Sequence, residues 1–263
     1  MELFDSHAHY FDRRFFGDEC PEGAASLLAR LFSAELCGVI NVGTDVGTTL
    51  AAIEQAKNFP NMYVAAGVHP SDAMQYEDRA GELSALERLF GDPQNKIVAL
   101  GEIGLDYHYP DTDKERQRLW FDEQLSLAEA YGLPVVIHDR EAHGDCLDVL
   151  RAHPRAFGVF HSFSGSIEMA RELLRRDFYI SFSGTVTFKN AQKVAAVAAA
   201  MPHDRTLIET DAPYLAPHPH RGELNHSGLM RFTAARIGEL WGIAPEEAAS
   251  ITAANARKLF LRK

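Results

Sequence analysis

Two histidines near the amino terminus, His7 and His9, are separated by a single residue. In an extended segment residues i and i+2 point to the same face, so both imidazoles can converge on one point. Convergent imidazoles are typical ligands of a divalent metal ion. The spacing alone is a weak signal, because many such pairs are ordinary surface histidines.

Other side chains with metal-binding chemistry follow short apolar runs elsewhere in the chain. Each comes at the end of such a run or just after it: His69, Glu102, His138, His161 and Asp211. Together with His7 and His9, this makes five of the 12 histidines at such positions. If the runs are parallel strands of one barrel, their carboxyl ends open onto one rim, where the catalytic residues of barrels gather.

Each candidate has an ordinary structural alternative. His138 and His161 can be core histidines bonded to a backbone carbonyl, and Asp211, which precedes Ala-Pro, can cap a turn. Glu102 ends an apolar run, where a buried carboxylate costs several kcal/mol unless a cation or an ion pair compensates it. We therefore expect Glu102 and Asp211 to be functional. His69 is expected to contact substrate or to lie around the ligands. Asp106 is interpreted as loop structure, with contact to substrate as its alternative.

The elements that must position these residues alternate along the chain. The predicted strands are Glu2–His7, Gly38–Val42, Met62–Val68, Ile97–Glu102, Pro134–His138, Ala156–His161, Phe178–Ser183 and Thr206–Glu209. Helical patterns lie between them, one behind the capping candidates Thr44 and Asp45, and two more follow the last strand, near Leu229–Trp241 and from Pro245 onward.

Strands that alternate with helices pair in parallel, and eight such units close into a (β/α)8 TIM barrel of the α/β class. The alternative, an open doubly wound sheet, would place a glycine-rich phosphate loop after the first strand. The sequence has Asp5-Ser6-His7-Ala8-His9 there instead. No linker divides the chain, so residues 1–263 are predicted to form a single domain.

These histidine and carboxylate ligands exceed what one tetrahedral ion needs. Two divalent ions, bridged by Glu102, account for the set, with Zn²⁺ or Mn²⁺ favoured by the imidazoles and Mg²⁺ also open. Such a pair lowers the pKa of bound water enough to generate hydroxide, a nucleophile for hydrolysis, at neutral pH. We therefore expect a metal-dependent hydrolase.

Composition limits the partners and the compartment. The formal charge of −11 argues against sequence-blind coating of nucleic acid, so a polyanion must be held locally. Three widely spaced cysteines indicate a reducing cytoplasm. We find neither a signal peptide nor an apolar run long enough to cross a bilayer, so we expect a cytoplasmic protein without membrane contact or a stable protein partner.

Seven motifs along nearly the whole chain resemble the TatD family of metal-dependent deoxyribonucleases, in the amidohydrolase superfamily. They are Phe4-Asp5-Ser6-His7-Ala8-His9, Gly67-Val68-His69-Pro70, Gly101-Glu102-Ile103-Gly104-Leu105-Asp106-Tyr107, Pro134-Val135-Val136-Ile137-His138, Phe160-His161-Ser162-Phe163-Ser164-Gly165, Tyr179-Ile180-Ser181-Phe182-Ser183-Gly184 and Glu209-Thr210-Asp211-Ala212-Pro213-Tyr214-Leu215-Ala216-Pro217.

The resemblance implies two ligand sets that share one carboxylate. One ion would be held by His7, His9, Glu102 and Asp211, and the other by Glu102, His138 and His161. It also implies hydrolysis of phosphodiester bonds in DNA, commonly from the 3′ end, with single strands or 3′ ends as the transient substrate.

One stretch departs from the family pattern. After Arg221-Gly222 the family often carries Lys, then Asn, Glu or Gln, and Pro, whereas this chain has Glu223-Leu224-Asn225-His226-Ser227-Gly228. The acidic residue weakens the case for a long DNA substrate. Arg221 is expected to anchor a phosphate, since a guanidinium holds two oxygens at once; its alternative is a surface arginine covering an apolar neighbour.

The predicted function is therefore that of a deoxyribonuclease or related phosphodiesterase in which Asp211 handles the proton and Glu102 bridges the ions. Two alternatives remain open. The same hydroxide would attack the carbonyl of a small amide or lactone, and a metal-binding scaffold without turnover would need the ligands but no open coordination position.

Overall fold

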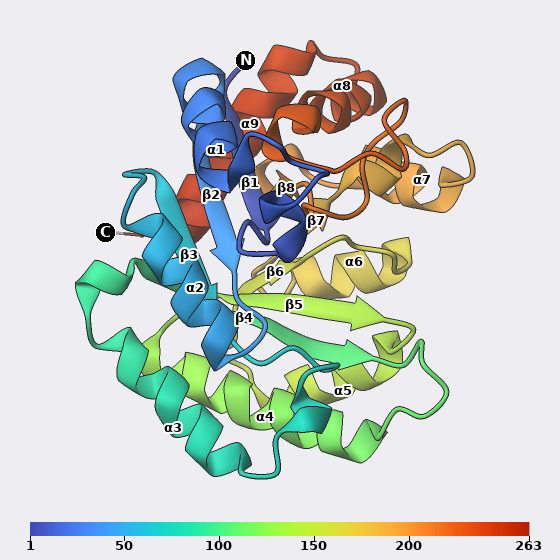
Figure 1. Ribbon diagram of the computed structural model, residues 1–263. Helices are drawn as coiled ribbons and strands as arrows, with labels where there is room; N and C mark the ends of the chain where they lie inside the picture. The colour runs from blue at the N-terminus through green and yellow to red at the C-terminus, as the bar shows by residue number, and fades with distance from the viewer. Residues whose placement is uncertain (263) are drawn as a thin grey trace.

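The computed structural model describes residues 1–262, and within them eight parallel strands follow one another around a single sheet in the order β1 to β8 (Figure 1). The strands are β1 (Leu3–Ala8), β2 (Leu36–Val42), β3 (Met62–Ala66), β4 (Ile97–Asp106), β5 (Val135–Arg140), β6 (Gly158–Phe160), β7 (Phe178–Phe182) and β8 (Thr206–Ile208). All eight predicted strands are present, and the predicted (β/α)8 barrel is confirmed.

Helices connect the strands and cover the outside of the barrel. They are α1 (Gly23–Ala34), α2 (Val46–Ala56), α3 (Arg79–Phe90), α4 (Lys114–Tyr131), α5 (His143–Ala152), α6 (Ile167–Leu174), α7 (Gln192–Ala200), α8 (Met230–Trp241) and α9 (Pro245–Phe260). Figure 1 shows α3 and α4 on one side of the strands and α8 and α9 on the other. Short 3-10 turns lie in several of the loops.

Two helix starts follow the capping chemistry expected from the sequence. Asp45 caps α2 in a reciprocal arrangement, in which its side chain accepts from the Thr48 backbone N–H while the Thr48 side chain bonds the Asp45 backbone. Helix α9 begins at Pro245, with Glu246 and Glu247 in its first turn.

The ends of the strands differ from the predicted ends, most of all in β4. That strand continues past Glu102 to Asp106, because β5 keeps pairing with it up to Arg140. Between Leu100 and Ile103 the register slips, so β4 holds one more residue than β5 does there. Glu102 therefore lies at a bulge within the strand and not at its carboxyl end.

The strands close into a barrel at a seam between β1 and β8. The backbone N–H of His9 donates to the Ala212 carbonyl at 2.7 Å, and that of Asp211 donates to the His7 carbonyl at 2.9 Å. Fully buried Asp5 reinforces the seam, because it accepts from the hydroxyls of Thr210 at 2.6 Å and Ser227 at 2.7 Å. The seam thus fixes the start of the chain beside the segment that follows β8.

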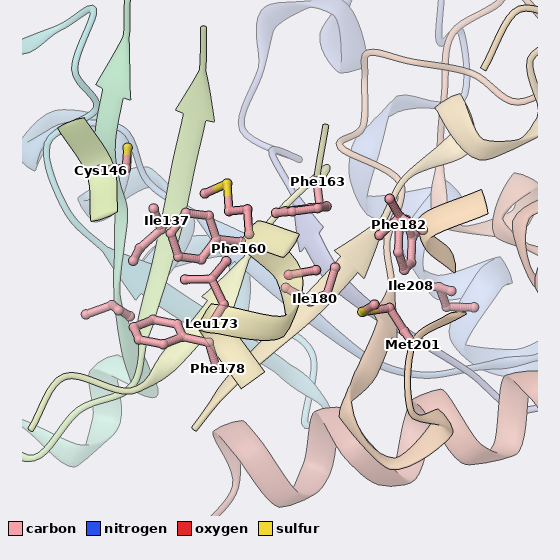
Figure 2. Close-up of a cluster of buried hydrophobic side chains, with 14 of the residues drawn as sticks. Ile137, Cys146, Phe160, Phe163, Leu173, Phe178, Ile180, Phe182, Met201 and Ile208 are labelled. Atoms are coloured by element: carbon pink, nitrogen blue, oxygen red, sulfur yellow. The ribbon is translucent and has the colours of Figure 1, made fainter. Parts of the chain in front are cut away.

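Alternate residues of the strands pack on two sides of the sheet. Figure 2 shows the outward set, in which Ile137, Phe160 and Ile180 pack against Cys146 of α5 and Leu173 of α6. The opposite set packs with α9: Phe4, Ile40, Ala65, Ala99, Val136, Val159, Tyr179 and Leu207 of the strands with Ala253, Ala256, Leu259 and Phe260. This alternation sets the direction of the next residues along β5 and β6, His138 and His161.

Helix α9 covers the end of the barrel where the strands begin. Arg257 pairs with Glu2, just before β1. The Asn255 side-chain amide donates to the carbonyls of His203 at 2.7 Å and Thr206 at 2.8 Å, at the start of β8. The opposite end, toward which the arrowheads of β4 and β5 point in Figure 1, carries the polar side chains described next. None of the helices in residues 1–262 is long and apolar enough to cross a membrane.

Candidate metal centre

The six side chains predicted to bind metal converge at the carboxyl end of the barrel around Glu102, whose carboxylate faces two groups of ligands. Its Oε2 atom lies 3.3 Å from His7 Nε2 and 3.6 Å from His9 Nε2. Asp211 completes this group, with Oδ1 at 3.7 Å from His7 Nε2 and 3.4 Å from His9 Nε2. These four side chains come from β1 and the residue that follows it, from β4, and from the segment after β8, so the seam positions most of the group.

The other oxygen of Glu102 faces the second group. Its Oε1 atom lies 2.9 Å from His138 Nδ1 and 2.9 Å from His161 Nε2. The same two nitrogens are 3.1 Å apart. One carboxylate therefore stands between two groups of donors, which is the arrangement that the resemblance implied.

In His9 and His161, a hydrogen bond to the nitrogen that points away from Glu102 determines which nitrogen faces Glu102. His9 Nδ1 lies 2.6 Å from the carbonyl oxygen of Val42, and His161 Nδ1 lies 3.2 Å from Glu209 Oε1. Each acceptor requires a proton on Nδ1, so in the neutral ring Nε2 is unprotonated and directs its lone pair toward Glu102. Glu209 is itself held by the backbone N–H of Ser162 at 2.7 Å.

His138 adopts the opposite tautomer, which also leaves an unprotonated nitrogen facing Glu102. Its Nε2 lies 3.3 Å from Asp106 Oδ2, which places the proton there and leaves Nδ1 to face Glu102. The interpretation of Asp106 as loop structure is therefore wrong: it is the last residue of β4, and its carboxylate contacts His138. For fully buried His7, Nδ1 has no hydrogen-bond partner within residues 1–262.

His69 lies beside the cluster with a proton on the nitrogen that faces it. Its Nδ1 accepts from the backbone N–H of Ser71 at 3.1 Å, so the neutral ring carries its proton on Nε2, 3.6 Å from Glu102 Oε1. Burial lowers the pKa of His69 to about 3, which keeps the ring neutral. An Nε2–H is a hydrogen-bond donor and not a metal ligand, and a role for His69 in binding substrate stays a prediction.

The surroundings of Glu102 keep it ionised. Burial alone would raise its pKa, but the imidazoles of His161, His69 and His7 outweigh that effect and hold the pKa well below the usual range. Only 4% of its side chain is exposed. A buried carboxylate needs a compensating positive charge, which protonated imidazoles supply here and a divalent ion would supply among unprotonated ones.

The donor set fits divalent metal ions of the kind that imidazoles prefer. Three groups of side chains place one potential ligand atom each within 4.8 Å of one another: His7, His9 and Asp211; His7, Glu102 and His161; His69, Glu102 and His138. Mixed nitrogen and carboxylate donors of this type suit Zn²⁺ or Mn²⁺. In the first two groups His9 and His161 direct a lone pair toward Glu102, whereas His69 presents an N–H in the third.

A cavity of about 420 Å³ opens beside the cluster. His138, His161 and Asp211 form its inner wall, and Arg140, Ser162, Phe163, Ser164, Thr185, Tyr214 and Leu215 are among the residues that line the rest. A substrate in this cavity would lie directly against the candidate ligands.

Arg221 lies outside this lining. Its guanidinium carbon is 4.1 Å from the centre of the Phe188 ring, and its side chain is exposed. Glu223, the acidic residue of the departing stretch, bonds His220 Nδ1 at 2.9 Å. A role for Arg221 as a phosphate anchor stays a prediction, and the contact with Phe188 is the one expected of a surface arginine that covers an apolar neighbour.

Two carboxylates of the site, Asp106 and Glu209, had no functional role in the sequence prediction. Both stand at or next to the end of a strand, as the ligands do, but each acts through an imidazole from a different strand. The position at a strand end was the available signal, whereas their partners follow only from the register between strands.

Comparison with known proteins gives a consistent result over the whole chain. The family described as TatD related DNase matches residues 4–261. The chain is similar to an uncharacterized metal-dependent hydrolase, YabD, of Bacillus subtilis, with 40% identity over 98% of each chain. It is also similar to an uncharacterized metal-dependent hydrolase of Escherichia coli, YcfH, with 36% identity over 99% of this chain and 96% of the relative. The solved structure of the Escherichia coli TatD homologue YJJV superposes with a TM-score of 0.88 at 32% identity, covering 99% of this chain and 98% of the other.

Proposed function

Because this chain belongs to the TatD related DNase family of metal-dependent hydrolases, we propose that it is a deoxyribonuclease that hydrolyses phosphodiester bonds at the 3′ ends of DNA. The observation that carries the proposal is the orientation of Glu102. One of its oxygens faces His7 and His9, and the other faces His138 and His161. This arrangement supports two divalent ions, Zn²⁺, Mn²⁺ or Mg²⁺, with Glu102 between them.

His7, His9, Glu102, His138, His161 and Asp211 would hold the ions, which would supply activation of water and stabilisation of the charge of a phosphoryl group. The rest of the chemistry belongs to the side chains. Asp211 directs Oδ1 toward His7 and His9, which leaves Oδ2 to take the proton of the attacking water. Its side chain is 15% exposed, so the proton can pass on to solvent.

His69 holds the phosphoryl group in this proposal. Its Nε2–H points toward Glu102 Oε1 and is available to a phosphoryl oxygen placed between the two groups of ligands. Because its pKa is about 3, it donates this hydrogen bond without titrating near neutral pH. The cavity beside His138 and Asp211 then takes the terminal nucleotide.

A panel of substrates tests the proposal. The protein is freed of metal, reloaded separately with Zn²⁺, Mn²⁺ and Mg²⁺, and assayed with oligodeoxynucleotides whose 3′ end is free or blocked, an aryl phosphodiester and a lactone. We expect about two ions per chain by elemental analysis and cleavage of the oligonucleotide with a free 3′ end. Turnover of the lactone alone would instead indicate an amidohydrolase or lactonase, and bound metal without any turnover a scaffold.

Two single substitutions test the assignment of the site. His161→Ala and Asp211→Ala are expected to abolish turnover while the protein stays folded, because each removes a donor that no neighbouring side chain replaces. Circular dichroism and the thermal unfolding transition verify folding. Near-normal activity in both variants would refute the assignment.

A further inference from the structure

Arg140, at the end of β5, lines the cavity next to the candidate ligands. It follows His138 by two residues, so its side chain leaves the strand on the same face. About 45% of the side chain is exposed. The guanidinium carbon lies 5.8 Å from the centre of the Tyr109 ring, which holds the charge at the mouth of the cavity.

The charge of Arg140 is only weakly compensated. Its one ion pair among residues 1–262 is with Asp106 Oδ2, at 3.9 Å, and that oxygen already accepts from His138 Nε2 at 3.3 Å. The lining of the cavity holds two acids: Asp139, which is paired with His143 at 2.8 Å, and the candidate ligand Asp211. Within the same described residues, the Arg140 guanidinium donates no hydrogen bond.

The remaining polar lining suits the same kind of ligand. Ser162, Ser164 and Thr185 line the cavity that Arg140 shares with His138 and Asp211, and the hydroxyls of Ser162 and Thr185 bond that of Ser183 at 2.9 and 3.0 Å. Hydroxyls and a free guanidinium are the usual partners of phosphate oxygens. In a chain with a net charge of −11, a weakly compensated arginine beside the candidate ligands is a specific attraction for a substrate anion.

We propose that Arg140 binds a second phosphate of the substrate, one nucleotide away from the phosphate that is cleaved. This inference rests on the proposed phosphodiesterase activity and adds a specificity rule to it: the site prefers a bond that has a neighbouring phosphate. The neighbouring group is either an internal phosphodiester or a terminal phosphomonoester, which offer the same oxygens to a guanidinium.

Three short substrates separate these cases. Thymidylyl-thymidine (TpT) has one phosphodiester and no neighbouring phosphate, pTpT adds a terminal phosphate, and TpTpT adds a second phosphodiester. For Arg140→Ala we expect KM to rise about tenfold on whichever of pTpT and TpTpT the wild-type enzyme prefers, with kcat within about threefold. KM and kcat on TpT should change less than twofold. Arg140→Lys should restore part of the loss, since it keeps the charge without the bidentate geometry.

Arg88→Ala is the matched control, because it removes one exposed arginine from α3, on the outside of the barrel. It should behave as the wild type on all three substrates. Equal losses for Arg140→Ala on TpT and on the longer substrates would overturn the proposal. So would a lower metal content in Arg140→Ala, because Arg140 would then act through Asp106 and His138.

A binding measurement is independent of turnover. Fluorescence anisotropy of a labelled oligodeoxythymidine with the metal-free protein gives Kd as a function of salt. For Arg140→Ala we expect a higher Kd than for Arg88→Ala. The slope of log Kd against log salt concentration should be shallower by about 0.7, the value for one phosphate contact to a single strand. If the wild type cleaves none of the substrates, the proposed activity fails, and this measurement still decides the role of Arg140: identical binding by both variants would exclude it.

Discussion

Three imidazoles of the cluster are each fixed by an acceptor on the nitrogen that faces away from Glu102. The acceptors differ: a backbone carbonyl for His9, Asp106 for His138 and Glu209 for His161. A carboxylate acceptor makes the ring more basic and orients it, so it strengthens the bond to a metal more than a neutral acceptor does.

Glu209→Gln tests this dependence. The substitution keeps the size of the side chain but removes the negative charge that faces His161 Nδ1, so we expect metal affinity to fall about 10- to 100-fold at one of the two ions. Isothermal titration with Zn²⁺ measures it. Asp122→Asn is the control, because Asp122 forms the same kind of pair with His153 outside the cluster, at 3.0 Å. Unchanged affinity in Glu209→Gln would show that the pair is not needed for metal binding.

His69 offers a second test, because its Nε2–H, and not a lone pair, faces Glu102. We expect His69→Ala to lower kcat about 100-fold, as the loss of one donor to the transition state does, while metal content stays unchanged. His69→Gln retains an N–H donor and should recover part of the rate. Loss of an ion in His69→Ala would contradict this and make His69 a ligand.

The ligand residues were predictable from the sequence, but their partners were not. His7, His9, Glu102 and Asp211 are recognisable because a histidine pair or an acid beside a buried run has few ordinary explanations. Asp106 has an ordinary explanation as a loop residue and Glu209 as the last residue of a predicted strand. The contacts that involve them cross from β4 to the end of β5 and from the end of β8 to the end of β6. Such contacts depend on strand register, which a single sequence does not give.

At the level of elements, the bulge in β4 is what directs Glu102 between the two groups of ligands. The Cβ of any other residue at Gly101 would lie 2.6 Å from Val136 Cβ, so the close approach of β4 to β5 depends on glycine there. The alternation of strands and helices predicted the barrel correctly. It did not predict that β4 extends to Asp106, because the apolar run ends earlier than the hydrogen-bonded ladder does.

Helix α9 allows stability to be separated from catalysis. Asn255→Ala removes the side-chain donor from the buried carbonyl of Thr206 and one donor from the carbonyl of His203, which keeps the backbone N–H of Thr206, so we expect the free energy of unfolding to fall by about 1–3 kcal/mol. The specific activity of the folded enzyme should not change, since α9 covers the end of the barrel opposite the metal centre. Urea unfolding and an activity assay measure the two effects. Asn61→Ala, at an exposed position, is the control; a loss of activity in folded Asn255→Ala would contradict the separation.

For the whole molecule, metal binding and the closing of the barrel are linked. The first group of ligands takes side chains from β1 and from the segment after β8, on the two sides of the seam. An ion held there would bind the folded chain and not the unfolded one, so it would stabilise the closed barrel.

Removal of metal should therefore lower the thermal stability. At a free metal concentration of about 100 times Kd, one ion contributes roughly 2.7 kcal/mol, so we expect Tm to fall by about 5–10 °C after chelation. Differential scanning calorimetry with and without a chelator measures the change. In Asp211→Ala the same chelation should cause a smaller shift. An equal shift in that variant would mean that the stabilising ion does not span the seam.

The seam also has a consequence for the timing of protein synthesis. Asp211 is synthesised about 200 residues after His7 and His9. A nascent polypeptide that ends before Asp211 holds only part of the set of candidate ligands. We therefore expect no hydrolytic activity from such a polypeptide.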